Sequence, residues 1–117
     1  MDLTITHTSN GGEHVLVLAG EIDAFTGPQL KERLLPLVNQ PDVRSVAVDL
    51  TAVEYMDSTG IGIFVAAMKA CRQTGCRLVV ERLSPRVERL FRLTGLYERI
   101  VPRKGESDEW RNDLRPM

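Results

Sequence analysis

The first twenty residues have the pattern of a β-hairpin. Apolar and polar residues alternate over residues 3–7, which is typical of a strand with one buried face. Asn10, Gly11 and Gly12 follow, and these residue types tolerate the positive φ angles of a tight turn. Residues 15–20 are apolar almost throughout, as expected for a strand near the centre of a sheet. We therefore expect two antiparallel strands joined by a short turn.

Three later segments have the apolar spacing of amphipathic helices, in which positions i, i+3, i+4 and i+7 share one side. These positions are Leu30, Leu34, Leu37 and Val38 in the first segment, Ile61, Phe64, Val65, Met68 and Cys71 in the second, and Val87, Leu90 and Phe91 in the third.

Each of these segments has start or stop signals. For the first helix, Thr26 is a candidate N-cap, Pro28 suits the first turn, and Gln29 is placed to complete a capping box. Pro36 lacks the amide that the helix interior needs, so we expect a kink or a loosened end there. The second helix must begin near Asp57 or Ser58.

The ends of the second and third helices are also marked. Gly75 is a natural stop for the second helix, and Ser84 before Pro85 can cap the third. Gly95 is a candidate C′ residue, with Leu96 placed for the contact of a Schellman motif.

Short apolar runs between and after these helices predict further strands, at residues 46–50, 77–81 and 100–101. The resulting order, β-β-α-β-α-β-α-β, implies an α/β fold: a mixed four- to five-stranded sheet with helices packed on it through right-handed crossovers. We expect one domain over residues 1–104. For residues 105–117 we expect a charged C-terminal tail that is frayed or contains one short helix, with Trp110, Leu114 and Met117 as the residues that could anchor it.

Composition narrows the class of protein. The chain has 117 residues, 43% of them apolar, which suits a single core. A net charge of −1 argues against nucleic-acid binding, and the basic residues Arg82, Arg86, Arg89 and Arg92 are interpreted as a solvated face or a partner contact. Because no apolar stretch approaches the length of a membrane span and no signal pattern follows Met1, we expect a cytoplasmic protein with no membrane partner.

Two cysteines, Cys71 and Cys76, are separated by a spacing that matches no zinc pattern. We expect reduced, structural thiols, and we expect neither a metal nor a cofactor.

The candidate chemistry lies in two loops, residues 21–23 and 55–62. If the strands before them run parallel, both loops emerge at the same carboxyl edge of the sheet. Ser58 would then lie at a helix N-terminus, where free amides and the helix dipole favour a phosphate. The added charge would stand beside Asp57, Glu54 and Asp23 and would alter an interface without unfolding the domain. Gly60 and Gly62 lack side chains, which would let a kinase cleft come close.

Three blocks together resemble one family: residues 20–23 (GEID), 56–62 (MDSTGIG) and 89–96 (RLFRLTGL). With these three blocks in this order, the chain resembles a stand-alone STAS domain of the anti-sigma factor antagonist type, found in bacterial partner-switching systems. The resemblance implies that the unphosphorylated form binds an anti-sigma factor, which is a serine kinase, and so releases the sigma factor. The resemblance also implies that phosphorylation at Ser58 abolishes binding and that a serine phosphatase restores it. The partner-binding residues implied are Asp23, Asp57, Ser58, Thr59, Gly60 and Ile61, the last a departure from the leucine common in the motif.

Other interpretations remain open for these residues. Ser58 could be a simple helix cap, Thr59 could be the modified residue, and Asp23 could be only a loop or cap residue. A lone STAS domain could also be an accessory subunit of a lipid or solute transport ATPase.

Enzymatic chemistry is not expected. A nucleophile elbow needs glycine where Met56 stands, and the only histidines, His7 and His14, flank the first turn. A phospho-aspartate receiver would use Asp49, but the paired acids expected after the first strand are missing.

Overall fold

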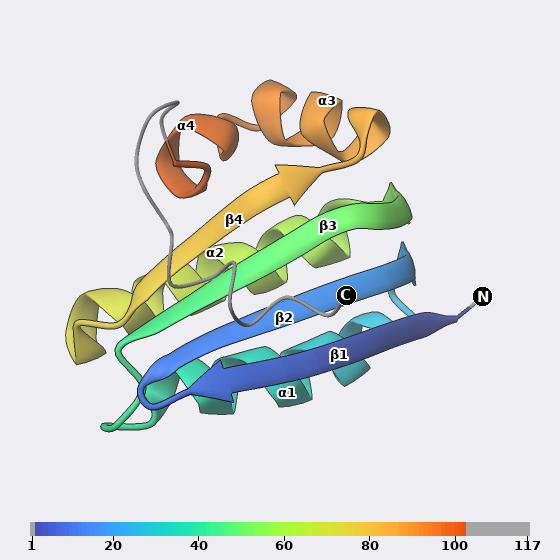
Figure 1. Cartoon of the computed structure of the whole chain (residues 1–117). Coiled ribbons are helices and arrows are strands. Elements are labelled where there is room, and N and C mark those ends of the chain that lie inside the picture. The colour runs from blue at the N-terminus through green and yellow to red at the C-terminus, as the bar shows by residue number, and fades with distance from the viewer. Residues whose placement is uncertain (1, 103–117) are drawn as a thin grey trace.

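A mixed sheet of four strands forms the framework of residues 2–102, the part of the chain that the computed structural model describes. The strands are β1 (Leu3–Asn10), β2 (Glu13–Ile22), β3 (Ser45–Met56) and β4 (Arg77–Leu83), and they lie in this order across the sheet (Figure 1). β1 is antiparallel to β2, whereas β2, β3 and β4 run parallel. The α/β class and the mixed sheet expected from the sequence are confirmed.

The hairpin has the turn that the sequence predicts. Asn10 pairs with Glu13, so Gly11 and Gly12 alone connect the two strands. Gly11 has a φ angle of 62°, which glycine adopts without the steric cost that a side chain would bring.

The helices are α1 (Gly27–Asn39), α2 (Ser58–Thr74), α3 (Pro85–Leu93) and the short α4 (Tyr97–Ile100). α1 and α2 lie side by side on one face of the sheet, and α3 and α4 lie beyond β4 (Figure 1). One core joins them, in which Phe64 of α2 meets Phe91 of α3 edge-on at 5.9 Å between ring centroids. On the opposite face of the sheet, a smaller apolar cluster contains Val15 and Ala47.

The start of α1 differs from the expected capping box. The Thr26 side chain makes no cap hydrogen bond, and the Gln29 amide donates instead to the carbonyl of Leu3 on β1, at 2.8 Å. Gln29 therefore ties the helix to the edge strand, a partner that lies 26 residues away in sequence. The helix also continues through Pro36 to Asn39.

The chain after α3 is helical where a strand was expected. α3 ends in the predicted Schellman motif: Gly95 has a φ angle of 77°, and the Leu96 amide donates to the Phe91 carbonyl at 2.9 Å. Leu96 then accepts from the amide of Ile100, which starts α4 at once and leaves no extended segment to pair with β4. The prediction of a strand at residues 100–101 is therefore wrong.

The expected charged tail lies outside the described residues, as does the proposed domain boundary at residue 104. Within residues 2–102, none of the helices has both the length and the apolar character needed to cross a bilayer.

Candidate functional site

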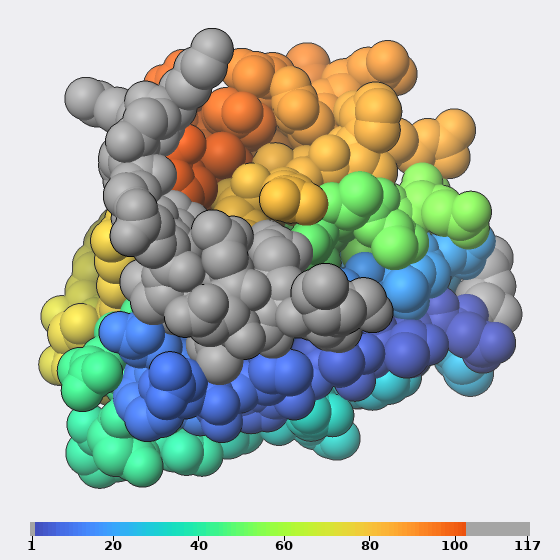
Figure 2. Space-filling view, in the orientation of Figure 1, coloured from blue at the N-terminus to red at the C-terminus, as the bar shows by residue number. Residues whose placement is uncertain are grey.

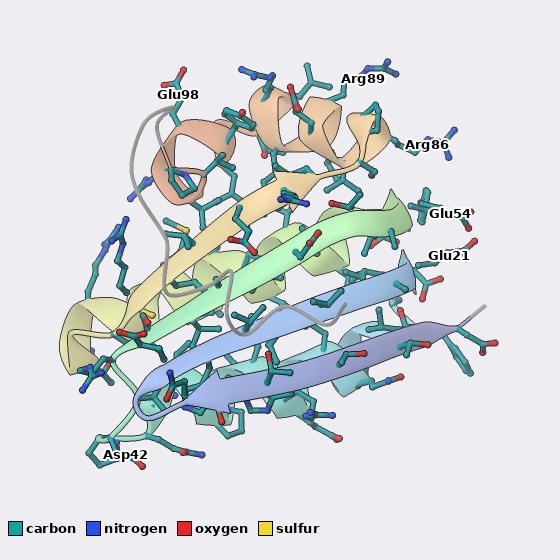
Figure 3. The ribbon with its side chains drawn as sticks, viewed as in Figure 1. Glu21, Asp42, Glu54, Arg86, Arg89 and Glu98 are labelled. Carbon is teal, nitrogen blue, oxygen red and sulfur yellow. The ribbon has the colours of Figure 1, made fainter. Side chains whose placement is uncertain are left out.

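Two loops meet at the carboxyl ends of β2 and β3. Ile22 is in register with Met56, and the amide of Asp57 donates to the carbonyl of Ile22 at 3.2 Å. The residues that follow each strand are therefore neighbours, which confirms the expectation of a shared edge. Figure 3 shows Glu21 and Glu54 at this end of the sheet, and the ends of both strands reach the molecular surface in Figure 2.

Asp23 organises the first loop. Its Oδ1 atom accepts hydrogen bonds from the amides of Phe25 and Thr26, both at 2.9 Å. The bond from the Thr26 amide is the main reason why the pKa of the Asp23 carboxyl lies below its usual value. The Thr26 hydroxyl donates to the carbonyl of Glu21 at 2.8 Å, which closes the loop into a compact turn. Asp23 thus caps the turn that leads into α1, where the Thr26 side chain makes no cap hydrogen bond.

Asp57 is the N-cap of α2. Its Oδ1 atom accepts from the amide of Thr59 at 2.9 Å, and its backbone is extended, as a cap residue requires. Ser58 is the first helical residue and its side chain is exposed. The capping role considered for Ser58 therefore belongs to Asp57, so that the fold leaves the hydroxyl at the surface.

Two glycines set the distance between the loops and the first turn of α2. A Cβ atom at Gly27 would lie 2.7 Å from the Thr59 methyl carbon, so α1 and α2 approach closely here. A Cβ atom at Gly60 would lie 2.5 Å from Cγ of Met56. Gly60 is buried, so its missing side chain serves packing inside the domain and does not open a path for a kinase. Gly62 is exposed with open space around it.

The six residues expected to bind a partner differ in their exposure to solvent. Ser58 is exposed and Gly60 is buried, while the other four are half-buried: Asp23, Asp57, Thr59 and Ile61. All six belong to the first loop or to the cap and first turn of α2.

Sequence reasoning missed an aromatic residue at this site. Phe25, between Asp23 and the start of α1, is 85% exposed, and Tyr55 at the end of β3 is 39% exposed. A large apolar side chain that belongs to no helical or strand periodicity was the available signal for Phe25. Exposed aromatic side chains are common anchors of protein interfaces.

The site contains hydroxyl, carboxylate and aromatic groups. Both histidines lie on the hairpin, at the other end of the sheet from Ser58. Across residues 2–102, no three side chains of the His, Cys, Asp or Glu type are grouped so as to hold a metal ion. The arrangement presents an exposed hydroxyl at a helix N-terminus, next to the carboxylate of Asp57.

Known proteins with this fold and sequence pattern agree on one family. The model of the STAS domain matches residues 4–109, and the chain belongs to the STAS domain family. The anti-sigma-B factor antagonist of Listeria monocytogenes is 40% identical over 109 residues, which cover 92% of this chain and 95% of that protein.

Solved structures agree with this assignment. An anti-sigma factor antagonist from Mycobacterium paratuberculosis superposes with a TM-score of 0.75 at 25% identity, covering 98% of this chain and 96% of the other. The Bacillus cell fate determinant SpoIIAA in its phosphorylated form has the same fold, with a TM-score of 0.71 at 19% identity, covering 94% and 96%.

Proposed function

We propose that this chain is an anti-sigma factor antagonist and that Ser58 is its phosphoacceptor. In the unphosphorylated form it binds an anti-sigma factor that is also a serine kinase, and the sigma factor is released. Phosphorylation of Ser58 ends this binding, and a serine phosphatase reverses it. The observation that carries the proposal is the exposed Ser58 hydroxyl on the first turn of α2, in a chain 40% identical to an anti-sigma-B factor antagonist.

Phosphoryl transfer to Ser58 needs little from this protein beyond access. The Ser58 oxygen attacks the γ-phosphorus of ATP, its proton passes to a base of the kinase, and ADP leaves. Because the hydroxyl is exposed and caps no helix amide, the kinase can take it without first breaking a capping bond. The helix N-terminus then tolerates the product, since its dipole favours negative charge.

The phosphate acts on binding through the charge of the surface. Asp23 and Asp57 already give this edge a negative character, and a phosphoserine adds a further charge of about −1.5 to −2 at neutral pH. A partner surface fitted to the neutral hydroxyl would then meet both bulk and charge at the centre of the contact. Phe25, which is 85% exposed beside Asp23, supplies an apolar anchor for the unphosphorylated complex.

The proposal can be tested by incubating the full chain with ATP and each candidate anti-sigma kinase, and then locating the modification by mass spectrometry. We expect one phosphoryl group, on Ser58, and none on the Ser58→Ala variant. Thr59→Ala is the matched control, because Thr59 is the neighbouring hydroxyl and should leave modification intact. Modification that persists in Ser58→Ala, or that disappears only in Thr59→Ala, would overturn the assignment of Ser58.

The release step needs its own measurement. Phosphorylated and unphosphorylated chains should be titrated against the same kinase, with the sigma factor already bound to it. The unphosphorylated chain should displace the sigma factor and the phosphorylated chain should not. Equal displacement by both forms would contradict the switch.

A further inference from the structure

The two histidines of the chain face each other across the hairpin. Nε2 of His7, on β1, lies 2.8 Å from Nδ1 of His14, on β2, and the ring centroids are 5.0 Å apart. By strand alternation both side chains lie on the face of the sheet that α1 and α2 cover, next to the turn at Gly11. The two nitrogens are within hydrogen-bonding distance, so an N–H of one imidazole donates to the other ring, and the pair lies at the surface within reach of solvent.

This convergence is close to what a tetrahedral metal ion needs. Zinc–nitrogen bonds are about 2.0–2.1 Å long, which puts two ligand nitrogens on one ion about 3.3 Å apart. Binding an ion replaces the hydrogen bond: the proton between the rings moves, through solvent, to the outer nitrogen of its own ring, and both inner nitrogens then offer lone pairs. The His7 and His14 nitrogens also separate by about half an ångström, which small rotations of the two rings supply. The hairpin already holds both side chains in place, so little conformational entropy is lost on binding.

The charges around the pair also matter. Arg33 on α1 faces His7 and Asp42, in the loop after α1, faces His14. Burial lowers the pKa of both imidazoles. His14 and the Arg33 guanidinium lower the pKa of His7 further, so Arg33 opposes a cation here, whereas the Asp42 carboxylate raises the pKa of His14 and favours one. Figure 3 shows Asp42 at the hairpin end of the sheet, away from Glu21 and Glu54.

We propose that His7 and His14 form a two-histidine chelating site for a late first-row divalent cation, with Zn²⁺ as the reference ion. Neutral imidazole is a preferred ligand of Zn²⁺, Cu²⁺ and Ni²⁺. Water completes the coordination, since two ligands converge here among residues 2–102, and Asp42 contributes favourable charge nearby. The bound ion ties β1 to β2 next to their turn. The site is independent of Ser58, which lies at the opposite end of the strands, after β3.

Zinc binding can be measured by titrating the full chain with Zn²⁺ in a calorimeter, in a buffer that does not bind the metal. We expect one ion per chain, and we expect His7→Gln and His14→Gln each to weaken binding by more than about tenfold. Ser9→Ala is the matched control, because Ser9 pairs with His14 on the hairpin and leaves both imidazoles in place. It should bind Zn²⁺ as the unaltered chain does.

A second readout excludes ions held elsewhere, for example by Cys71 and Cys76. Nitrogen-15 NMR of the imidazole rings should show zinc-dependent shifts at Nε2 of His7 and Nδ1 of His14. Zn²⁺ should also raise the melting temperature of the unaltered chain but not of the two histidine variants. The proposal is overturned if no saturable binding occurs up to about 1 mM Zn²⁺, or if the histidine variants bind as tightly as the unaltered chain.

Discussion

Gly27, at the start of α1, lies so close to Thr59, in the first turn of α2, that a Cβ atom on the glycine would come within 2.7 Å of the threonine methyl carbon. This contact joins the loop that contains Asp23 to the helix turn that presents Ser58. The switch region is therefore one packed unit made from two loops that are more than thirty residues apart in the printed sequence. Changes in packing below this surface should consequently affect both stability and partner binding.

Two glycines in α2, Gly60 and Gly62, allow the effect of packing on stability to be measured apart from the effect of helix propensity. Replacing a helical glycine with alanine favours the helix by about 0.8–1 kcal/mol. Gly62→Ala should give this gain, because nothing lies within 4 Å of its Cβ position. Gly60→Ala should instead destabilise the fold by about 1–3 kcal/mol, because its Cβ would lie 2.5 Å from Met56 Cγ and 3.0 Å from Ile22 Cγ2. Urea denaturation of both variants measures the difference, and equal stabilisation by both would contradict the tight packing.

Charge at Ser58 should control partner binding. Ser58→Asp places a carboxylate where the phosphate would lie, so we expect affinity for the anti-sigma factor to fall by at least about tenfold. Ser58→Ala should bind as the unmodified chain does and should resist release by ATP. Calorimetric titration against the same anti-sigma factor compares the two variants, and equal affinities would refute an interface mechanism.

The first loop should show a pH dependence that comes from Asp23. Hydrogen bonds from backbone amides lower the pKa of this carboxyl below the reference value of 3.8. A carboxyl with a lower pKa in the folded state stabilises the fold above its unfolded pKa and loses that contribution as the pH falls through the folded value. Asp23→Ala should therefore be less stable than the unaltered chain at pH 7, and the difference should shrink below pH 3.8.

Glu54→Ala, which removes an exposed acid at the same edge, is the control. A difference between Asp23→Ala and the unaltered chain that stays constant from pH 7 to the acid limit would show that Asp23 acts through packing alone.

The two thiols should be inert in the folded protein. Cys71 and Cys76 are free and buried, and burial raises the pKa of the Cys71 thiol to about 12. Because only the thiolate reacts with iodoacetamide, neither residue should be alkylated at pH 8 until the chain is unfolded in urea. Mass spectrometry before and after urea addition checks this, and rapid labelling of the native chain would show that α2 opens near its end.

Local signals in the sequence were sufficient for most of the fold. Apolar periodicity located α1, α2 and α3, Gly11 marked the hairpin turn, and Gly95 marked the end of α3. Such signals act over a few residues, so they are visible without knowledge of distant partners. The apolar pair at residues 100–101 predicts a strand, but Ile100 ends α4, because a short apolar run has the same pattern in a strand as in a buried helical turn.

The site was predictable in its position and less so in its contacts. The meeting of the two loops was expected on the condition that β2 and β3 run parallel, and the structure shows that they do. The roles within the loops could not be derived from the sequence: Asp23 and Asp57 rather than Thr26 and Ser58 accept the capping hydrogen bonds. Neighbouring polar residues can all serve as caps, and only the path of the backbone decides which oxygen reaches the free amide.

The sequence by itself determined the order of the elements from β1 to α3 and the presence of a serine at a helix start, because these depend on short-range spacing. Only the tertiary structure decided that Gly60 is buried, that Gln29 reaches the Leu3 carbonyl and that the His7 and His14 rings meet. These contacts join residues through the packing of separate elements, and their distances depend on the final positions of whole helices and strands. No local pattern contains that information.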